Sequence, residues 1–144
     1  MAKVVAVNIS EKKGIPKSPI GKGYFEVDQG LVGDAHAGNW HRQVSLLGTE
    51  SFEKVKAMGI KDLEVGRFAE NITTEGIVLY KLPIGTRLRV GEAVMEVTQI
   101  GKECHTGCAI REQIGDCVMP REGIFTIIIT PGWVKPGDEI EVVI

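Results

Sequence analysis

Short runs of aliphatic and β-branched residues recur along the chain, separated by Gly, Pro and Asp. Runs of this length, interrupted by turn-forming residues, are typical of β-strands. Their regular spacing predicts a mainly β fold, a closed or partly open β-barrel or a sandwich, with one or two short helices. We expect six strands, at residues 3–9, 43–47, 86–90, 93–100, 124–130 and 139–144.

The clearest predicted hairpin joins TRLRV to AVMEVTQI through Gly91 and Glu92. Gly91 can adopt the positive φ that a type II′ turn requires at its first central position. Alternation along this hairpin predicts four residues that face a core, namely Leu88, Val90, Val94 and Val97. The segment IFTIIIT is apolar at nearly every position, which indicates a strand buried on both faces.

A helix is predicted from Thr49, which can act as N-cap, to a stop at Gly59. Glu50 suits the first turn of this helix because a carboxylate there complements the helix dipole. A second, weaker helical turn is expected near residues 61–65. The segment at residues 11–23, EKKGIPKSPIGKG, is expected to be a long exposed loop whose lysines are mostly solvated.

Size and charge are those of one ordinary domain that recognises its partners locally. The 144 residues are expected to form a single domain, 1–144, and the net charge of −2 contains no long run of either sign. This excludes an electrostatic footprint for nucleic acid or a membrane surface. The N-terminus has no secretory pattern, and no apolar run is long enough to span a bilayer. The three cysteines are an odd number, which suits free thiols in the cytoplasm.

All three cysteines, Cys104, Cys108 and Cys117, lie in one turn-rich connection between two predicted strands, with His105 beside the first. A catalytic or carrier cysteine must be exposed and held as a thiolate, which a basic neighbour such as Arg121 can favour. Zinc is an alternative, but adjacent Cys and His residues fit one tetrahedral site poorly and no Cys-x-x-Cys pair is present. A buried, inert role is preferred for at least one of the other two cysteines.

Two further polar segments are candidates for binding. Residues 30–48 combine four glycines with Asp34, His36, His41 and Arg42, so backbone amides can approach an anion while Arg42 clamps phosphate or carboxylate. The alternative for this segment is a turn in which Asp34 caps its own backbone and both histidines lie at the surface.

Residues 66–77, GRFAENITTEGI, form the second polar segment. Asn71 is expected to enter a strand with its amide directed into a cleft, and Thr73 offers a further donor and acceptor. Polar strand ends are also common for purely structural reasons. In that alternative, Glu70 caps a turn or pairs with Arg67 at the surface, where an ion pair contributes little.

Taken in order, three motifs resemble the MOSC domain: GLVGDAHAG with HRQVSLLG, then GRFAENITTEGI, then PIGTRLRVGEAVMEVTQIGKEC. MOSC domains form the C-terminal part of molybdenum-cofactor sulfurases and also occur as small stand-alone bacterial proteins. The resemblance covers roughly residues 20–144. It implies a mostly β, barrel-like fold with a cleft that binds the pyranopterin molybdenum cofactor or carries sulfur for a metal-sulfur cluster.

At the level of residues, the resemblance implies that Cys104 is the family's characteristic cysteine, because it follows the EVTQ strand by a few positions. It would be a sulfur nucleophile, a persulfide carrier or a molybdenum ligand, since a soft thiolate suits each role. Arg42 and the glycine-rich loop would hold the pterin phosphate. The full set of predicted cofactor contacts is Gly33, Asp34, His36, Arg42, Asn71, Thr73 and Arg121.

The sequence also departs from the family pattern. Larger cofactor-using relatives have a basic residue close to the Asn of the second motif, where this chain has Ala69. Multidomain relatives contain a pyridoxal-phosphate desulfurase, and no such domain is expected within these 144 residues. The chain should therefore receive sulfur from a cysteine desulfurase, or act with proteins of molybdenum-cofactor biosynthesis, rather than extract sulfur itself.

Three functional hypotheses follow from the resemblance. The first is a cofactor-binding protein that carries sulfur on Cys104. The second is a non-catalytic module that delivers the cofactor to a biosynthetic partner or docks on it, with structural cysteines. The third is a molybdenum-dependent reductase of N-hydroxylated compounds, which needs an external electron donor because the sequence contains no flavin or iron-sulfur domain.

Overall fold

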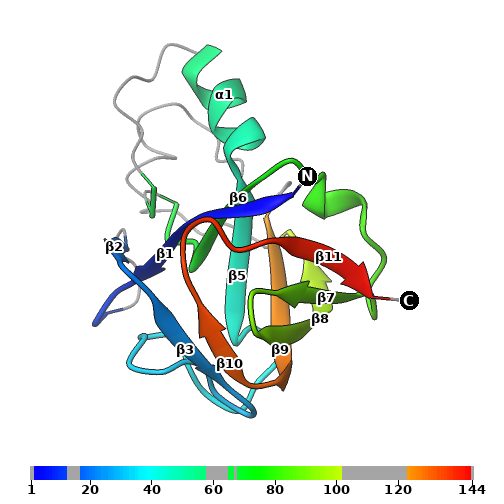
Figure 1. Cartoon of the computed structure of the whole chain (residues 1–144). Helices are drawn as coiled ribbons and strands as arrows, with labels where there is room; N and C mark the ends of the chain where they lie inside the picture. Colours follow the sequence, from blue (N-terminus) through cyan, green and yellow to red (C-terminus); the bar gives the residue numbers. More distant parts are fainter. Residues whose placement is uncertain (1, 13–16, 58–64, 67, 102–122, 144) are drawn as a thin grey trace.

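A computed structural model describes residues 2–12, 17–57, 65–66, 68–101 and 123–143 of the protein. The strands of the described chain form two sheets (Figure 1). The larger, in spatial order, contains β11 (Ile140–Val143), β7 (Arg87–Val90), β8 (Ala93–Ile100), β9 (Ile124–Thr130), β5 (Val44–Gly48), β6 (Ile72–Glu75), β1 (Lys3–Ile9) and β2 (Ser18–Ile20). The smaller contains β10 (Gly132–Val134), β3 (Gly23–Glu26) and β4 (Gly30–Leu31).

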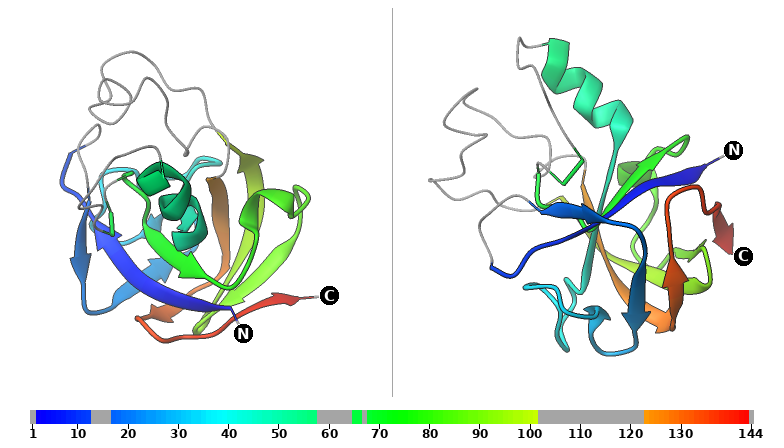
Figure 2. Two further views of the ribbon diagram at one scale, coloured as in Figure 1. Left: turned by 90° about the horizontal axis from the view of Figure 1, so that it is seen from above. Right: turned by 60° about the vertical axis from the view of Figure 1, so that its left-hand side comes forward.

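The larger sheet curls around a common core, as both views in Figure 2 show. Its neighbouring strands are antiparallel except for the parallel pair of β5 and β6. The start of β1 lies beside the start of β11, where the Val4 amide donates to the Asp138 carbonyl oxygen at 2.8 Å and the Ile140 amide donates to Ala2 at 3.0 Å. No continuous ladder joins β1 to β11 among the described residues, so the predicted mainly β, partly open barrel is confirmed.

The core fills the inside of this curled sheet because alternate residues of each strand point inward. Its members come from strands throughout the chain and are almost entirely removed from solvent: Val4, Val7, Phe25, Leu31, Val44, Leu46, Ile72, Leu79, Leu88, Val90, Ala93, Met95, Val97, Ile124, Ile128, Val134 and Ile140. The predicted apolar strand at residues 124–130 is β9. Its first three residues are all buried, but from Ile127 on the strand alternates between partly exposed and buried residues and ends exposed, so burial on both faces was predicted correctly only for its first half.

The predicted β7–β8 hairpin is present, and Gly91 has the expected positive φ of 57°. One core assignment within it was wrong. Val94 is partly exposed because it pairs with Arg89, which lies on the outer face, whereas Met95 pairs with the buried Leu88. The two-residue turn therefore directs Met95 inward rather than Val94, and alternation then buries Val97 as predicted.

The predicted helix is α1 (Thr49–Ala57), which projects over one end of the ring of strands (Figure 2). Phe52 on its inner face is buried and packs edge-on against Phe68, with ring centroids 5.1 Å apart. The predicted stop at Gly59 lies outside the described residues. The weaker turn predicted at residues 61–65 also lies outside them, except for its last residue. A short 3₁₀ helix, η1 (Leu79–Lys81), was not predicted. Neither helix in the described ranges is long and apolar enough to cross a membrane.

The segment predicted to be a long exposed loop contains β2, which pairs with the end of β1. Lys12 and Lys22 are exposed, as expected. Lys17 is not, because only 3% of its surface reaches solvent. The prediction was therefore wrong for this lysine, and the contacts that bury it define the most polar part of the interior.

Candidate functional site

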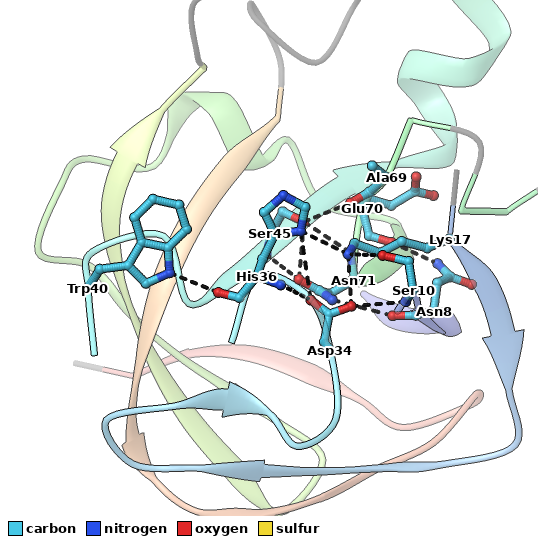
Figure 3. A network of polar contacts seen from close by, with 10 residues as sticks. All are labelled: Asn8, Ser10, Lys17, Asp34, His36, Trp40, Ser45, Ala69, Glu70 and Asn71. Atoms are coloured by element: carbon cyan, nitrogen blue, oxygen red, sulfur yellow. Dashed lines mark hydrogen bonds and ion pairs between the residues drawn. The ribbon is translucent and has the colours of Figure 1, made fainter. Parts of the chain in front are cut away.

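A buried lysine lies at the centre of the candidate site. The Lys17 ammonium donates to the Ser10 hydroxyl at 2.9 Å, to Asp34 Oδ1 at 2.8 Å and to His36 Nδ1 at 3.0 Å (Figure 3). The Lys17 and Asp34 side chains are both completely inaccessible to solvent. A buried charge is tolerated only when it is paired and hydrogen bonded, and here the ammonium has both a carboxylate partner and hydrogen-bond acceptors.

Asp34 joins three separate segments of chain. Its carboxylate accepts hydrogen bonds from the Ser10 amide at 3.1 Å and from the His36 amide at 3.0 Å, in addition to the bond from Lys17. Burial alone would raise the pKa of Asp34, but the hydrogen bond and charge of Lys17, together with bonds from Asn71 and Ser10, lower it. Asp34 therefore caps its own loop, as one alternative predicted, and also balances the buried ammonium.

Glu70 is the second buried carboxyl group near this network. It accepts hydrogen bonds from the Gly66 amide at 2.9 Å, the Phe68 amide at 3.2 Å and the Thr73 hydroxyl at 2.6 Å. Burial raises the pKa of Glu70 despite these donors. Glu70 thus caps a turn, which was one predicted alternative, but it is in the interior rather than at the surface. Arg67, its other suggested partner, lies outside the described residues.

The turn capped by Glu70 holds the backbone of Lys17. The Lys17 amide donates to the Gly66 carbonyl oxygen at 2.8 Å. Gly66 has φ +83°, and a Cβ atom there would overlap the Lys17 carbonyl oxygen. Only glycine combines this conformation with so close an approach of two backbones. Glu70, Gly66 and Lys17 therefore form one continuous structural link to Asp34.

Asn71 and Thr73 are fully buried and bond within the chain. Asn71 Oδ1 accepts from the Ser45 amide at 3.0 Å, and its Nδ2 donates to the Asn8 carbonyl oxygen at 3.3 Å. The Thr73 hydroxyl accepts from Asn8 Nδ2 at 3.0 Å while donating to Glu70. These bonds fasten β1, β5 and β6 together directly behind the Asp34 loop. Asn8 Oδ1 is buried without a hydrogen-bond partner in the described part of the chain.

Arg42 lies at the other end of the glycine-rich loop. Its Nε donates to Gln99 Oε1 at 3.0 Å, and its guanidinium carbon lies 5.2 Å from the centre of the Phe125 ring. His41 Nε2 donates to the same Gln99 oxygen at 3.0 Å. Within the described ranges, no hydrogen bond or ion pair engages the two terminal nitrogens of Arg42. Their fork geometry matches a phosphate or carboxylate group.

The loop between these two clusters reaches the surface. Gly33 is exposed with φ +91°, and the His36 side chain retains 26% of its accessible surface. The Trp40 indole donates to the His36 carbonyl oxygen at 2.8 Å and is itself partly exposed (Figure 3). A ligand at this loop would thus meet an imidazole, an indole and backbone groups supported by the buried Lys17–Asp34 pair.

Strand β8, which precedes the cysteine segment in the sequence, ends next to this loop. Cys104, Cys108, Cys117, His105 and Arg121 lie outside the described residues. The two glycines that flank the segment are described, and the Gly101 amide donates to the Gly123 carbonyl oxygen at 2.6 Å. Gln99 Nε2 also donates to the Gly101 carbonyl oxygen at 2.7 Å, so the residue that holds Arg42 also holds the point where this segment leaves β8.

No group of three or more His, Cys, Asp or Glu side chains arranged for a metal ion occurs among the residues that the structure describes. A cavity of about 510 Å³ lies elsewhere, between the β7–β8 turn and the turn before β11. It shares no residue with the polar network. Its lining residues are Lys22, Arg89, Gly91, Glu92, Trp133, Lys135, Asp138, Glu139 and Glu141.

The family model for the MOSC domain matches residues 33–141, which include both the Asp34 loop and the Arg42 cluster. The chain belongs to the MOSC domain family. This confirms the predicted resemblance and indicates a function related to the molybdenum cofactor. No curated protein matches the chain.

Solved MOSC-type structures share the fold. The YuaD protein of Bacillus subtilis superposes with a TM-score of 0.81 at 22% identity, covering 99% of this chain and 96% of its own. YiiM of Geobacillus stearothermophilus has a TM-score of 0.77 at 18% identity, covering 100% of this chain and 76% of its own. YiiM of Escherichia coli has a TM-score of 0.72 at 20% identity, with 100% and 70% covered.

Arg42 of this MOSC domain has a geometry that fits the phosphate group of the pyranopterin. Arg42 is fixed through Nε and over Phe125, which leaves its terminal donors for an anion. Lys17 and Gln99, which position the loop, were not among the predicted site residues. Gln99 belongs to the EVTQ strand that located Cys104, so its place in that motif was the available signal. No pattern separated Lys17 from its exposed neighbours.

Proposed function

We propose that this MOSC domain binds the pyranopterin molybdenum cofactor over the loop of residues 33–42 and the adjoining end of β8. In this proposal, Cys104 supplies the thiolate that ligates molybdenum or carries a sulfur atom. The observation that carries the proposal is the shared anchoring by Gln99 of Arg42 and of Gly101, three residues before Cys104. The same side chain, Gln99, therefore holds both the arginine proposed to bind the anion and Gly101, from which the chain continues to Cys104.

Each site residue has a distinct task in this proposal. Arg42 binds the cofactor phosphate with its terminal guanidinium nitrogens, and the backbone around Gly33 approaches it closely. Arg121 adds a second positive charge at the end of the cysteine segment. The bound cofactor would supply two-electron redox chemistry, for which a soft thiolate is a suitable ligand.

Asp34, Asn71 and Thr73 support the site from behind. Their described bonds connect the loop to β1, β5 and β6, which fixes the backbone that faces the ligand. Direct contact between Asn71 or Thr73 and the polar rim of the pterin stays a prediction, as do cytoplasmic localisation and a cysteine desulfurase or a cofactor-biosynthesis protein as partner.

Native mass spectrometry tests the proposal. The protein is produced in a host that makes the cofactor, and any adduct is located by peptide mapping. We expect retained cofactor, or an added sulfur on Cys104. The Cys104→Ser variant should lose it, whereas the matched Cys117→Ser variant should retain most of it. Equal loss from both variants would contradict a single carrier cysteine.

The same experiment separates the other two functions. Cofactor retained undiminished by Cys104→Ser would favour a delivery or docking module, in which the cysteines are structural. A loaded protein that turns over an N-hydroxylated compound with an external electron donor would favour the reductase. Apo-protein recovered despite an available cofactor and sulfur donor would contradict cofactor binding and sulfur loading together.

A further inference from the structure

An irregularity in the pairing of β8 with β9, which lie side by side in Figure 1, determines the face on which Gln99 lies. Val97 lies opposite Thr126, and Gln99 lies opposite Phe125. One extra residue, Thr98, is therefore inserted on the β8 side. Regular alternation would turn Gln99 to the same face as Val97, whose side chain is buried in the core. The bulge instead places Gln99 on the face of Phe125.

The side-chain amide of Gln99 has one orientation that fits its neighbours. Its Nε2 donates at 2.7 Å to the Gly101 carbonyl oxygen, which can only accept. This leaves Oε1 to accept from Arg42 Nε and from His41 Nε2, each at 3.0 Å. The acceptor that fixes Arg42 is therefore an uncharged carbonyl group.

Arg42 keeps its full positive charge in this arrangement. A carboxylate at the same place would also fix the guanidinium group, but it would neutralise it as an ion pair. Arg87 and Arg89 are paired in this way, with Glu96 at 3.2 Å and with Glu141 at 3.5 Å. Arg42 takes part in none of the ion pairs between described residues, and its guanidinium carbon lies over an aromatic ring instead.

We propose that Gln99 is a positioning residue that determines the specificity of the Arg42 site for anions. It holds the guanidinium group through a neutral acceptor, so the terminal nitrogens present an unneutralised charge to a phosphate or a similar oxyanion. A glutamate at position 99 would hold Arg42 equally well and abolish this specificity. The identity of the oxyanion as the cofactor phosphate rests on the proposed function, whereas the charge selection by Gln99 does not.

Sulfate binding to the metal-free protein tests the proposal without the cofactor, because sulfate is a tetrahedral oxyanion that stays doubly charged in mild acid. The Arg42 Nε–H signal in ¹⁵N correlation spectra, assigned from its loss in Arg42→Gln, reports the bond to Gln99 through its slow exchange with water. The backbone amide signals of residues 33–42 report sulfate affinity. We expect a protected Arg42 signal and saturable shifts in the wild type. A rapidly exchanging Arg42 signal, or the absence of saturable shifts, would overturn the proposal.

Two substitutions of Gln99 separate position from charge. Gln99→Glu keeps an acceptor for Arg42 and adds a negative charge, whereas Gln99→Met is of similar length and has neither. Both lose the donor to Gly101. We expect the Arg42 signal to stay protected in Gln99→Glu and to exchange faster in Gln99→Met. Sulfate affinity should nevertheless fall further in Gln99→Glu, by about tenfold, than in Gln99→Met, by about threefold. Equal or tighter binding by Gln99→Glu than by Gln99→Met would overturn the proposal.

The pH dependence of sulfate binding is a second test, because a glutamate at position 99 loses its charge in acid and glutamine does not titrate. The charged or titratable groups that contact position 99 are Arg42 and His41, and its partner on β9, Phe125, carries no charge. His41 is therefore replaced by glutamine in both proteins. We expect the affinity of His41→Gln, Gln99→Glu to rise toward that of His41→Gln as the pH falls. The same pH dependence in both proteins would overturn charge as the cause.

Gln29→Glu is the matched control, because it adds the same charge at an exposed position. Gln99 is partly exposed, so none of these substitutions changes the core, and circular dichroism checks each fold. Gln29→Glu should bind sulfate as the wild type does. A loss equal to that in Gln99→Glu would show that net charge, rather than the group beside Arg42, controls binding.

Cofactor retention in a cofactor-making host separates this inference from the proposed function. Gln99→Glu should retain less cofactor than Gln99→Met. Sulfate results as expected, with no cofactor retained by the wild type, would refute the cofactor function and leave the anion specificity established. Cofactor retained by the wild type and undiminished in Gln99→Glu would overturn the inference and leave the cofactor function standing.

Discussion

Two Lys–Asp pairs in the described part of the chain have nearly the same geometry and opposite surroundings. Lys17 and Asp34 lie 2.8 Å apart with both side chains completely buried, whereas Lys135 and Asp138 lie 2.7 Å apart with the Lys135 side chain 64% exposed. The surface pair closes a turn before β11 and is screened by water. The buried pair had to lose its hydration, so its formation depends on every neighbouring hydrogen bond.

This contrast also separates two candidate sites. The 510 Å³ cavity is lined by exposed pairs such as Lys135–Asp138 and Arg89–Glu141, each weakened by solvent. The Asp34 loop instead rests on buried charge and on two carboxyl groups with shifted pKa values. Perturbed, interconnected ionisable groups are a better indication of chemistry than volume alone.

The largest predicted effect comes from breaking the buried pair. Lys17→Met leaves the Asp34 carboxylate without its counter-charge in the interior, and we expect a loss of about 3–5 kcal/mol in the free energy of unfolding. The matched Lys135→Met variant should shift the unfolding midpoint little. Urea denaturation followed by circular dichroism measures both variants. Similar effects of the two substitutions would contradict the contrast.

The next largest effect should come from the backbone that holds Lys17. Gly66 and Gly85 both have positive φ, 83° and 94°, but only at Gly66 would a Cβ atom meet backbone. Gly85→Ala should lower the free energy of unfolding by about 1–2 kcal/mol, because alanine is strained in the left-handed conformation. Gly66→Ala should cost about 1–3 kcal/mol more, because the Lys17 carbonyl must move. Thermal unfolding of both variants measures this difference, and an equal loss would show that the close approach is unimportant.

Glu70→Gln should have a smaller effect. A side-chain amide cannot accept from both the Gly66 and Phe68 amides in the way that the carboxyl group does, so one buried N–H loses its partner. We expect a loss of about 1–3 kcal/mol. The exposed Glu53→Gln serves as the control. The raised pKa of Glu70 means that its contribution to the stability of the wild type is complete below pH 4.5 and is lost as the pH rises through the folded-state pKa. The difference in stability between the wild type and Glu70→Gln should therefore shrink as the pH rises.

The acid response of Asp34 should have the opposite sign to that of Glu70. Its pKa lies below the ordinary 3.8, so its stabilisation is present above 3.8 and lost as pH falls through the folded value. Asp34→Asn should therefore flatten the fall in stability below pH 3.8. Denaturation curves at a series of acidic pH values test this. A steeper fall in the variant would mean that Asp34 is not ionised in the folded protein.

Much of the barrel could be predicted from the sequence, because its strands alternate or are uniformly apolar. The predicted run at residues 93–100 matches β8, and the run at residues 124–130 matches β9. The three-stranded sheet could not be predicted, because β4 has only two residues and β10 has only three. Segments this short carry too few positions for a period to be recognised.

The candidate site was predicted in part. Asp34, His36 and Arg42 stood out because charged residues among glycines suggest a binding loop. Lys17 did not, since a lysine between prolines in KGIPKSPIG is typical of a solvated turn. Its burial depends on Gly66 and Asp34, which lie far away in the chain, so no local pattern could reveal it.

Cofactor retention in a matched pair of arginine variants tests the central claim most directly. Arg42 lies at the proposed cofactor loop, whereas Arg89 lines the surface cavity. Proteins carrying Arg42→Gln or Arg89→Gln are produced with the wild type in a cofactor-making host and compared by native mass spectrometry. We predict that Arg42→Gln loses most of the cofactor while Arg89→Gln retains it as the wild type does. Retention by Arg42→Gln with loss by Arg89→Gln would contradict the assignment of the site.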